Sequence, residues 1–216
     1  MSLELFAGTL NRYYCDVDTP EEAARTNEIV CHWRDTIVGA VKKAAPEAEP
    51  WEENTEKEYL ALQLPEMAFG ALLTYAASVA YGHKCRETVY PGWNFEAEAD
   101  VQSARADRSM VMTLLMGASW WLPVQTPIML RGEVPTGDVA TIASAGALMI
   151  ELLRINEMGW KADEEEVLKW FETEGKMDPD AKRYSTESLA KHAYSIFWQL
   201  AKFSLQNKVP VIMDQI

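Results

Sequence analysis

The sequence predicts a mainly α fold: a single compact multi-helix domain over residues 1–216 with a few short strands or extended segments. Apolar side chains recur at helical spacing in several long segments, and helix-capping residues stand at the ends of those segments. No internal repeat, low-complexity tract or glycine-rich linker divides the chain. Helices that each bury one apolar face are therefore expected to share one core.

The clearest predicted helix covers residues 20–45. Thr19 is placed to cap its first turn, Pro20 suits the first helical position, and Glu22 completes a capping box. Apolar residues then recur at helical spacing until Pro46, which ends the pattern. We therefore expect an amphipathic helix with one buried face.

A glutamate-rich segment follows this helix. Residues 46–59 contain six glutamates and two prolines, which is typical of a solvated loop. Trp51 is expected to anchor the loop to the body of the protein. If the loop is solvated, replacing Glu53 with alanine should change the free energy of unfolding by no more than about 0.5 kcal/mol.

The next segment is expected to form the central helix of the fold. Residues 65–81 are nearly continuously apolar, but they are too few for a membrane span of about 20 residues. Leu72 and Val79 lie two helical turns apart on one face, so both are expected to be deeply buried.

Three more helices are predicted toward the C-terminus. One lies near residues 140–158 and begins between Asp138 and Ile142, and the next is capped by Asp163. The last covers residues 185–208, with an apolar row along one side. We expect the first and last of these, together with the helix capped by Thr19, to surround the central helix.

Three short apolar stretches do not reveal their secondary structure. Residues 3–14 and 109–116 fit either a strand or a helix, because short apolar runs carry no decisive periodicity. Residues 209–216 are compatible with one short strand.

Charge and composition limit the classes of partner. The chain has 33 acidic and 20 basic residues and a formal net charge of −13, which repels the phosphates of nucleic acids. The charge favours a basic protein partner, or serves solubility alone. The first residues show no secretory pattern and no segment suits a membrane span, so we expect a cytoplasmic protein without a membrane partner.

The cysteines and histidines predict neither a metal site nor a cofactor. Cys15, Cys31 and Cys85 are widely spaced, which is typical of free thiols in a reducing cytoplasm. No cysteine–histidine spacing of a zinc site occurs. We therefore expect no metal and no cofactor.

Recognisable catalytic motifs are absent from the sequence. The chain has no phosphate-binding loop, dinucleotide-binding glycine pattern, nucleophile elbow or zinc-protease motif. This absence favours a non-enzymatic role without deciding the question. Glu151 and Arg154, three positions apart in an apolar helix, either mark a site or lie on a solvated stripe that Glu157 continues. The solvated stripe is the simpler interpretation.

Residues 117–138 form the most unusual stretch of the chain. Its three prolines favour extended backbone, and its Pro-Thr-Gly-Asp turn is placed to lead into a helix capped by Asp138 or Thr141. The amides at that helix start would be able to hold an anion beside Arg131. A packed connection between helices is the simpler interpretation. If the stretch binds a ligand, the candidate residues are Trp120, Trp121, Arg131, Thr136 and Asp138.

Three segments resemble a family of bacterial proteins with no assigned activity: LFAGTLNRYY (5–14), PTGD (135–138) and STESLAKHAYSIF (185–197). The resemblance spans most of the chain and implies no catalytic residues. Small acidic α-rich proteins of this kind are often immunity proteins or antitoxins, a link that rests on analogy of fold and charge.

Two functions follow as hypotheses. The first is a cytoplasmic protein-interaction module of the immunity type that binds a basic toxin or effector. The alternative is a small-ligand binder or enzyme with a pocket around residues 120–138. The chain is expected to be a monomer or a homodimer.

Overall fold

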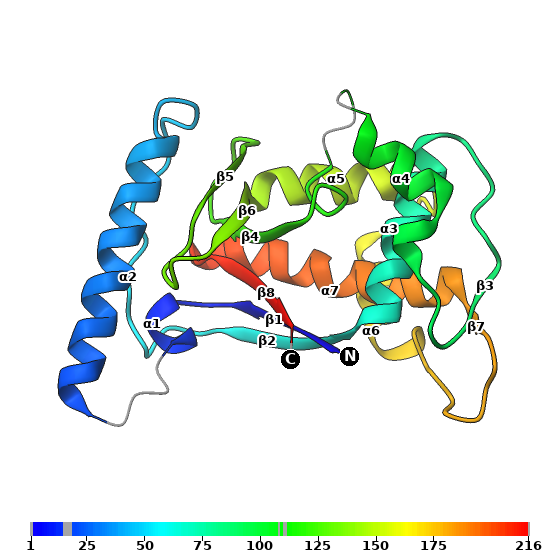
Figure 1. Ribbon diagram of the computed structural model, residues 1–216, viewed down its shortest axis with the longest axis horizontal. Helices are drawn as coiled ribbons and strands as arrows, with labels where there is room; N and C mark the ends of the chain where they lie inside the picture. Colours follow the sequence, from blue (N-terminus) through cyan, green and yellow to red (C-terminus); the bar gives the residue numbers. More distant parts are fainter. Residues whose placement is uncertain (1, 15–18, 108, 110–111, 216) are drawn as a thin grey trace.

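The computed structural model describes residues 2–14, 19–107, 109 and 112–215. Within them lie seven α-helices, a six-stranded mixed sheet and a two-stranded sheet, with 48% helix and 17% strand. The predicted mainly α class is therefore wrong, and the fold is mixed α/β (Figure 1). Short apolar stretches that the sequence places between helices pair with one another into a central sheet.

The central sheet has the strand order β2-β1-β8-β4-β6-β5. In that order the strands are β2 (Leu60–Pro65), β1 (Ser2–Ala7), β8 (Val211–Gln215), β4 (Ala118–Leu122), β6 (Val139–Ser144) and β5 (Met129–Glu133). Neighbouring strands are antiparallel except β4 and β6, which are parallel. Because β1 and β8 are antiparallel neighbours, the two ends of the chain lie side by side (Figure 1).

Helices cover the two faces of this sheet unequally. One face packs against α3 (Glu66–Ala80), α5 (Ala145–Met158) and α7 (Thr186–Asn207), with α4 (Ala99–Ala106) and α6 (Glu164–Thr173) outside them. The other face meets α1 (Leu10–Tyr13) and α2 (Pro20–Val41), and α2 stands apart from the helices of the first face (Figure 1). We call these two sides of the sheet the bundle face and the α2 face.

A small sheet lies at the end of the molecule far from α2. It consists of β3 (Thr88–Val89) and β7 (Tyr184–Ser185), and a short 3-10 helix (Phe95–Ala97) follows β3 in the chain (Figure 1).

Helix α2 begins as the sequence predicts. The Thr19 hydroxyl accepts a hydrogen bond from the Glu22 N–H at 3.2 Å, and the Glu22 carboxylate accepts one from the Thr19 N–H at 3.2 Å. This reciprocal pair is the predicted capping box. The helix meets the sheet through a narrow stripe, whose buried residues are Val30, Ile37, Val38 and Val41.

Helix α3 forms the predicted apolar core element, with two corrections. Leu72 is fully buried, but Val79 is only half-buried, so the prediction of deep burial is wrong for Val79. The neighbours of α3 are α7, α5 and α4, and not α2. The reason is the sheet itself, which separates α2 from the bundle.

The helix predicted near 140–158 begins later than expected. Residues 139–144 form the strand β6, and Ser144 caps α5 by accepting a hydrogen bond from the Ala147 N–H at 3.1 Å. Asp138 and Thr141 therefore cap no helix. The predictions for the last two helices are confirmed, including the Asp163 cap of α6.

The ambiguous stretches also take definite forms. Residues 3–14 contribute both a strand, β1, and a short helix, α1, while the C-terminal stretch forms β8. Residues 113–117 make turns, and residues 110 and 111 lie outside the described residues. Within the described ranges, no helix has the length and apolar character to cross a membrane.

Candidate functional site

The two predicted tryptophans lie on opposite faces of the sheet. They are adjacent on β4, and successive side chains of a strand point to opposite sides. Trp120 packs on the α2 face, with its ring centroid 5.3 Å from that of Trp33. Trp121 is fully buried on the bundle face, where its indole N–H donates to the Thr113 hydroxyl at 3.1 Å. The structure therefore does not bring these two indoles into one pocket.

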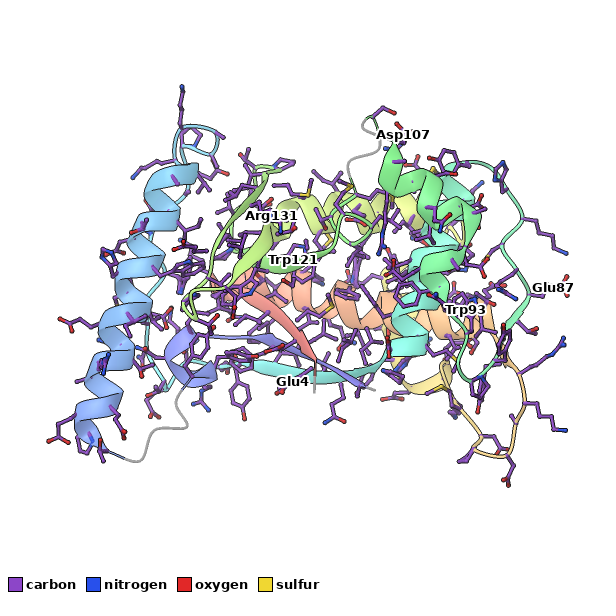
Figure 2. The ribbon with its side chains drawn as sticks, in the orientation of Figure 1. Glu4, Glu87, Trp93, Asp107, Trp121 and Arg131 are labelled. Atoms are coloured by element: carbon purple, nitrogen blue, oxygen red, sulfur yellow. The ribbon has the colours of Figure 1, made fainter. Side chains whose placement is uncertain are left out.

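The other predicted residues lie on the hairpin that joins β5 to β6. Arg131 is exposed on β5, an edge strand of the sheet, whereas Trp121 is fully buried on β4; Figure 2 labels both residues. The Thr136 hydroxyl donates to the Asp138 carboxylate at 2.8 Å within the hairpin turn, where Gly137 has a φ of 87°. Because no helix starts there, the expected anion site at a helix start does not form.

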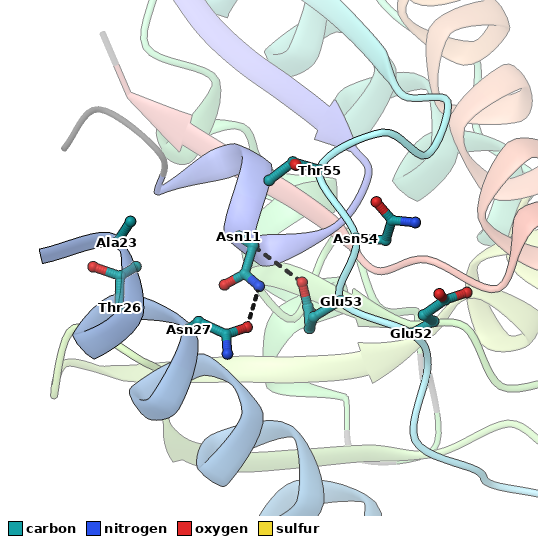
Figure 3. A pocket seen from close by; sticks show the side chains of 8 residues that line it. All are labelled: Asn11, Ala23, Thr26, Asn27, Glu52, Glu53, Asn54 and Thr55. Atoms are coloured by element: carbon teal, nitrogen blue, oxygen red, sulfur yellow. Dashed lines mark hydrogen bonds between the residues drawn. The ribbon is translucent and has the colours of Figure 1, made fainter. Parts of the chain in front are cut away.

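A polar pocket instead lies between α1, the first turns of α2 and the glutamate-rich loop. Its volume is about 370 Å³, and it is lined by Asn11, Ala23, Thr26, Asn27, Glu52, Glu53, Asn54 and Thr55. Figure 3 shows that Asn11 stands at its centre and is hydrogen-bonded to Asn27 of α2 and to Glu53 of the loop. We call this cavity the acidic pocket.

The loop beside the acidic pocket is held in place by its own residues. Trp51 is buried, as predicted, and its indole N–H donates to the Glu53 carboxylate. The same carboxylate accepts a hydrogen bond from the Asn11 N–H at 3.0 Å. Partial burial raises the pKa of Glu53, although these hydrogen bonds oppose the rise. The prediction that Glu53 stands in a freely solvated loop is therefore wrong.

The walls of the acidic pocket are rich in hydrogen-bond acceptors. The buried Oδ1 of Asn11 has no hydrogen-bond partner among the described residues, and the exposed Glu52 carboxylate has only Lys57 nearby, at 3.6 Å. Nine glutamates occur in residues 10–13, 19–28 and 46–59, against two arginines and one lysine. A pocket with these acceptors and this field attracts a cationic donor such as an ammonium or guanidinium group.

Glu151 corrects the interpretation of the Glu151–Arg154 pair. Arg154 is exposed, as the solvated stripe predicts, but Glu151 is only 4% exposed. Its carboxylate accepts hydrogen bonds from the Thr113 N–H at 2.6 Å, the Thr113 hydroxyl at 2.7 Å and the Leu114 N–H at 3.3 Å. Burial raises the pKa of Glu151 to about 7, against the effect of these donors. Helical spacing is a signal for this burial, because Leu148, Glu151, Leu152 and Ile155 share one face of α5. The donors themselves lie far away in sequence.

A second polar cluster joins α3 to α4. The Nδ1 atom of His83 lies 2.9 Å from one Asp100 oxygen, and the Ser78 hydroxyl donates to the other oxygen at 2.9 Å. Burial raises the pKa of the neighbouring Cys85 thiol to about 11, which disfavours the reactive thiolate. The cluster therefore fits a structural role at the end of α3 better than nucleophilic catalysis.

The described cysteines and acidic groups show no arrangement for a metal. Cys31 and Cys85 are free, and Cys15 lies outside the described residues. Within the described ranges, no three histidine, cysteine, aspartate or glutamate side chains are grouped to hold a metal ion.

Comparisons with protein-family models, with curated proteins and with solved structures find no match to this chain. The acidic pocket therefore has to be interpreted from its own geometry.

Proposed function

We propose that the protein is a protein-interaction module that binds a basic partner protein through the acidic pocket. A lysine or arginine side chain of the partner enters the pocket between α1, α2 and the loop. The observation that carries this proposal is the pocket itself: an acceptor-rich cavity of about 370 Å³ on a chain with a net charge of −13.

The pocket suits a cation better than an anion or an apolar group. Lysine and arginine have several N–H donors and no acceptor, so they complement the exposed Glu52 carboxylate, whose ion-pair partner among the described residues is Lys57 at 3.6 Å. The anchored loop limits the entropy that binding must remove, because Trp51 and Glu53 already hold its backbone.

The wider charge distribution supports the same proposal. The glutamates around the pocket attract a basic protein over distances up to about a Debye length and speed its association. A basic toxin or effector of the kind that immunity proteins bind presents such a surface. The protein then acts by covering the basic surface of its partner.

The test is affinity capture of partners from the native lysate with the tagged chain as bait. We expect the native chain to retain a basic protein that elutes as salt is raised, since exposed ion pairs are screened. The double variant Glu52→Lys/Glu56→Lys should lose that protein.

The matched control changes the charge equally at a distant place. Glu172→Lys/Asp180→Lys alters two exposed acidic residues in and after α6, away from the pocket. It should retain the partner. If neither the native chain nor the control captures a basic protein, or if the pocket variant captures it equally well, the proposal is wrong.

A further inference from the structure

The strand β5 forms one of the two edges of the central sheet, and some of its backbone groups pair with no other described strand. The Ser144 N–H donates to the Ile128 carbonyl at 3.1 Å, and the Val134 N–H donates to the Asp138 carbonyl at 2.9 Å. Both bonds fit the β5–β6 register. The hydrogen-bonded positions of an antiparallel ladder alternate along each strand. The backbone N–H and C=O groups of the even-numbered residues of this segment therefore point toward β6, and those of the odd-numbered residues point away from the sheet.

The outward positions of β5 are Met129, Arg131 and Glu133. The Glu133 carbonyl already accepts a hydrogen bond from the Trp33 indole at 2.7 Å, so α2 closes that end of the edge. No hydrogen bond from the described residues reaches the outward backbone groups of Met129 and Arg131. A further strand therefore has a place to pair at these two positions.

An apolar cavity of about 220 Å³ opens beside this edge, between α5 and the start of β5. It is lined by Met112, Thr113, Pro127, Ile128, Met129, Ala147, Ile150, Glu151 and Arg154. The Ser144 hydroxyl accepts hydrogen bonds from both the Ile128 and Ala147 N–H groups, which ties the start of β5 to α5. The backbone of the loop before β5 also packs closely on α5 at Gly146, where a Cβ atom would lie 1.9 Å from the Gln125 carbonyl oxygen. The cavity is thus preformed.

The surface around the cavity is apolar and carries two unpaired cations. Ile150 and Leu153 on α5 are 53% and 49% exposed. Arg131 and Arg154 are exposed and form no ion pair with any described carboxylate. In an acidic chain, two free guanidinium groups beside an open strand edge complement a carboxylate from outside.

We propose that this groove binds an extended segment of a partner polypeptide as an additional strand on β5. The segment places one apolar side chain in the cavity and one acidic side chain near Arg131 and Arg154. Met129 and Arg131 are two positions apart on the same side of β5, so the apolar and acidic residues are expected two positions apart in the segment. The groove is separate from the acidic pocket, and this inference does not rest on the function proposed for that pocket.

A second copy of the chain fits the edge less well. Two β5 strands paired about an axis at Arg131 would place the two guanidinium groups opposite each other, and like charges opposite one another destabilise a ladder.

The test selects peptides from a phage-displayed library of random short peptides on the immobilised native chain. We expect enrichment of sequences with an apolar and an acidic residue separated by one position. The variant Arg131→Pro removes an outward N–H and no β5–β6 bond, so it should fold and bind the selected peptides about tenfold or more weakly. Arg131→Gln should keep the binding but lose the preference for acidic residues.

Two further measurements keep the outcome decisive. Amide exchange of the native chain with a selected peptide should protect Met129 and Arg131, and this readout holds even if Arg131→Pro fails to fold. Glu52→Lys/Glu56→Lys should bind the peptides normally, which separates this groove from the acidic pocket. No enriched peptides, unprotected amides or full binding by folded Arg131→Pro would overturn the proposal, as would a dimer in sedimentation that Arg131→Pro abolishes.

Discussion

The two faces of the central sheet differ in how much structure covers them. Three helices pack on the bundle face, where α3 alone has nine buried residues, whereas α2 buries four over a longer span. Trp120 and Trp121 show the contrast within one strand: Trp121 is fully buried and hydrogen-bonded, while Trp120 packs against Trp33 of α2. The difference indicates that the bundle face buries more apolar side chains than the α2 face and supplies most of the stability.

Each face also uses one carboxylate to hold a loop. Glu151 of α5 caps the turn at residues 113–117 on the bundle side, and Glu53 accepts the Asn11 N–H on the α2 side. Burial raises the pKa of both carboxyl groups: Glu151 is fully enclosed, and Glu53 is partly enclosed. A carboxylate therefore holds a loop on each face, and its contribution to the free energy of unfolding should be larger where it is more deeply buried.

The largest expected effect compares core substitutions on the two faces. Leu72→Ala should lower the free energy of unfolding by about 2–5 kcal/mol, because the densely packed bundle cannot collapse around the cavity. Ile37→Ala on α2 should lower the free energy of unfolding by about 2 kcal/mol or less, since α2 is free to shift toward the sheet. Denaturant melts measure both. Equal costs would show that the two faces are equally rigid.

The next effect concerns the pH dependence that Glu151 imposes. Its pKa is about 7 in the fold against 4.5 as the ordinary value, so the folded state holds an extra proton between these pH values. The free energy of unfolding should therefore fall as pH rises through this window, by about 3 kcal/mol from this group. In Glu151→Gln that fall should be absent, whatever its overall stability. Parallel pH-dependent slopes in the two proteins would contradict the burial of a titrating Glu151.

The smallest effect concerns the loop on the α2 face. Glu53→Ala should cost about 1–2 kcal/mol, because it leaves the Asn11 N–H and the Trp51 indole without their acceptor. Glu56→Ala changes an exposed side chain of the same loop and should stay within about 0.5 kcal/mol. Thermal melts at matched pH compare the two. If both variants melt alike, the loop is as solvated as its composition predicts.

The sequence by itself determined the elements whose signals are local. The Thr19 capping box, the Asp163 cap and the apolar segment around Leu72 each predict a helix, and α2, α6 and α3 form there. Such signals work because a cap and the residues it serves lie within one turn of each other. The burial of Trp51 was predictable for a similar reason, because a large apolar side chain in an otherwise acidic loop gains stability by packing against the body of the protein.

Only the tertiary structure decided the fold class and the candidate sites. The pairing of β1 with β8 places Phe6 opposite Ile212. The periodicity of a six-residue strand cannot predict a pairing partner so far away in sequence. The separation of Trp120 from Trp121 follows once β4 is a strand, because its side chains alternate between the two faces. The donors that Glu151 meets come from the remote turn at residues 113–117. The acidic pocket likewise joins Asn11, Asn27 and Glu53 from three segments. Contacts between remote segments are set by packing of the whole chain, whereas helix caps are set by neighbours in sequence.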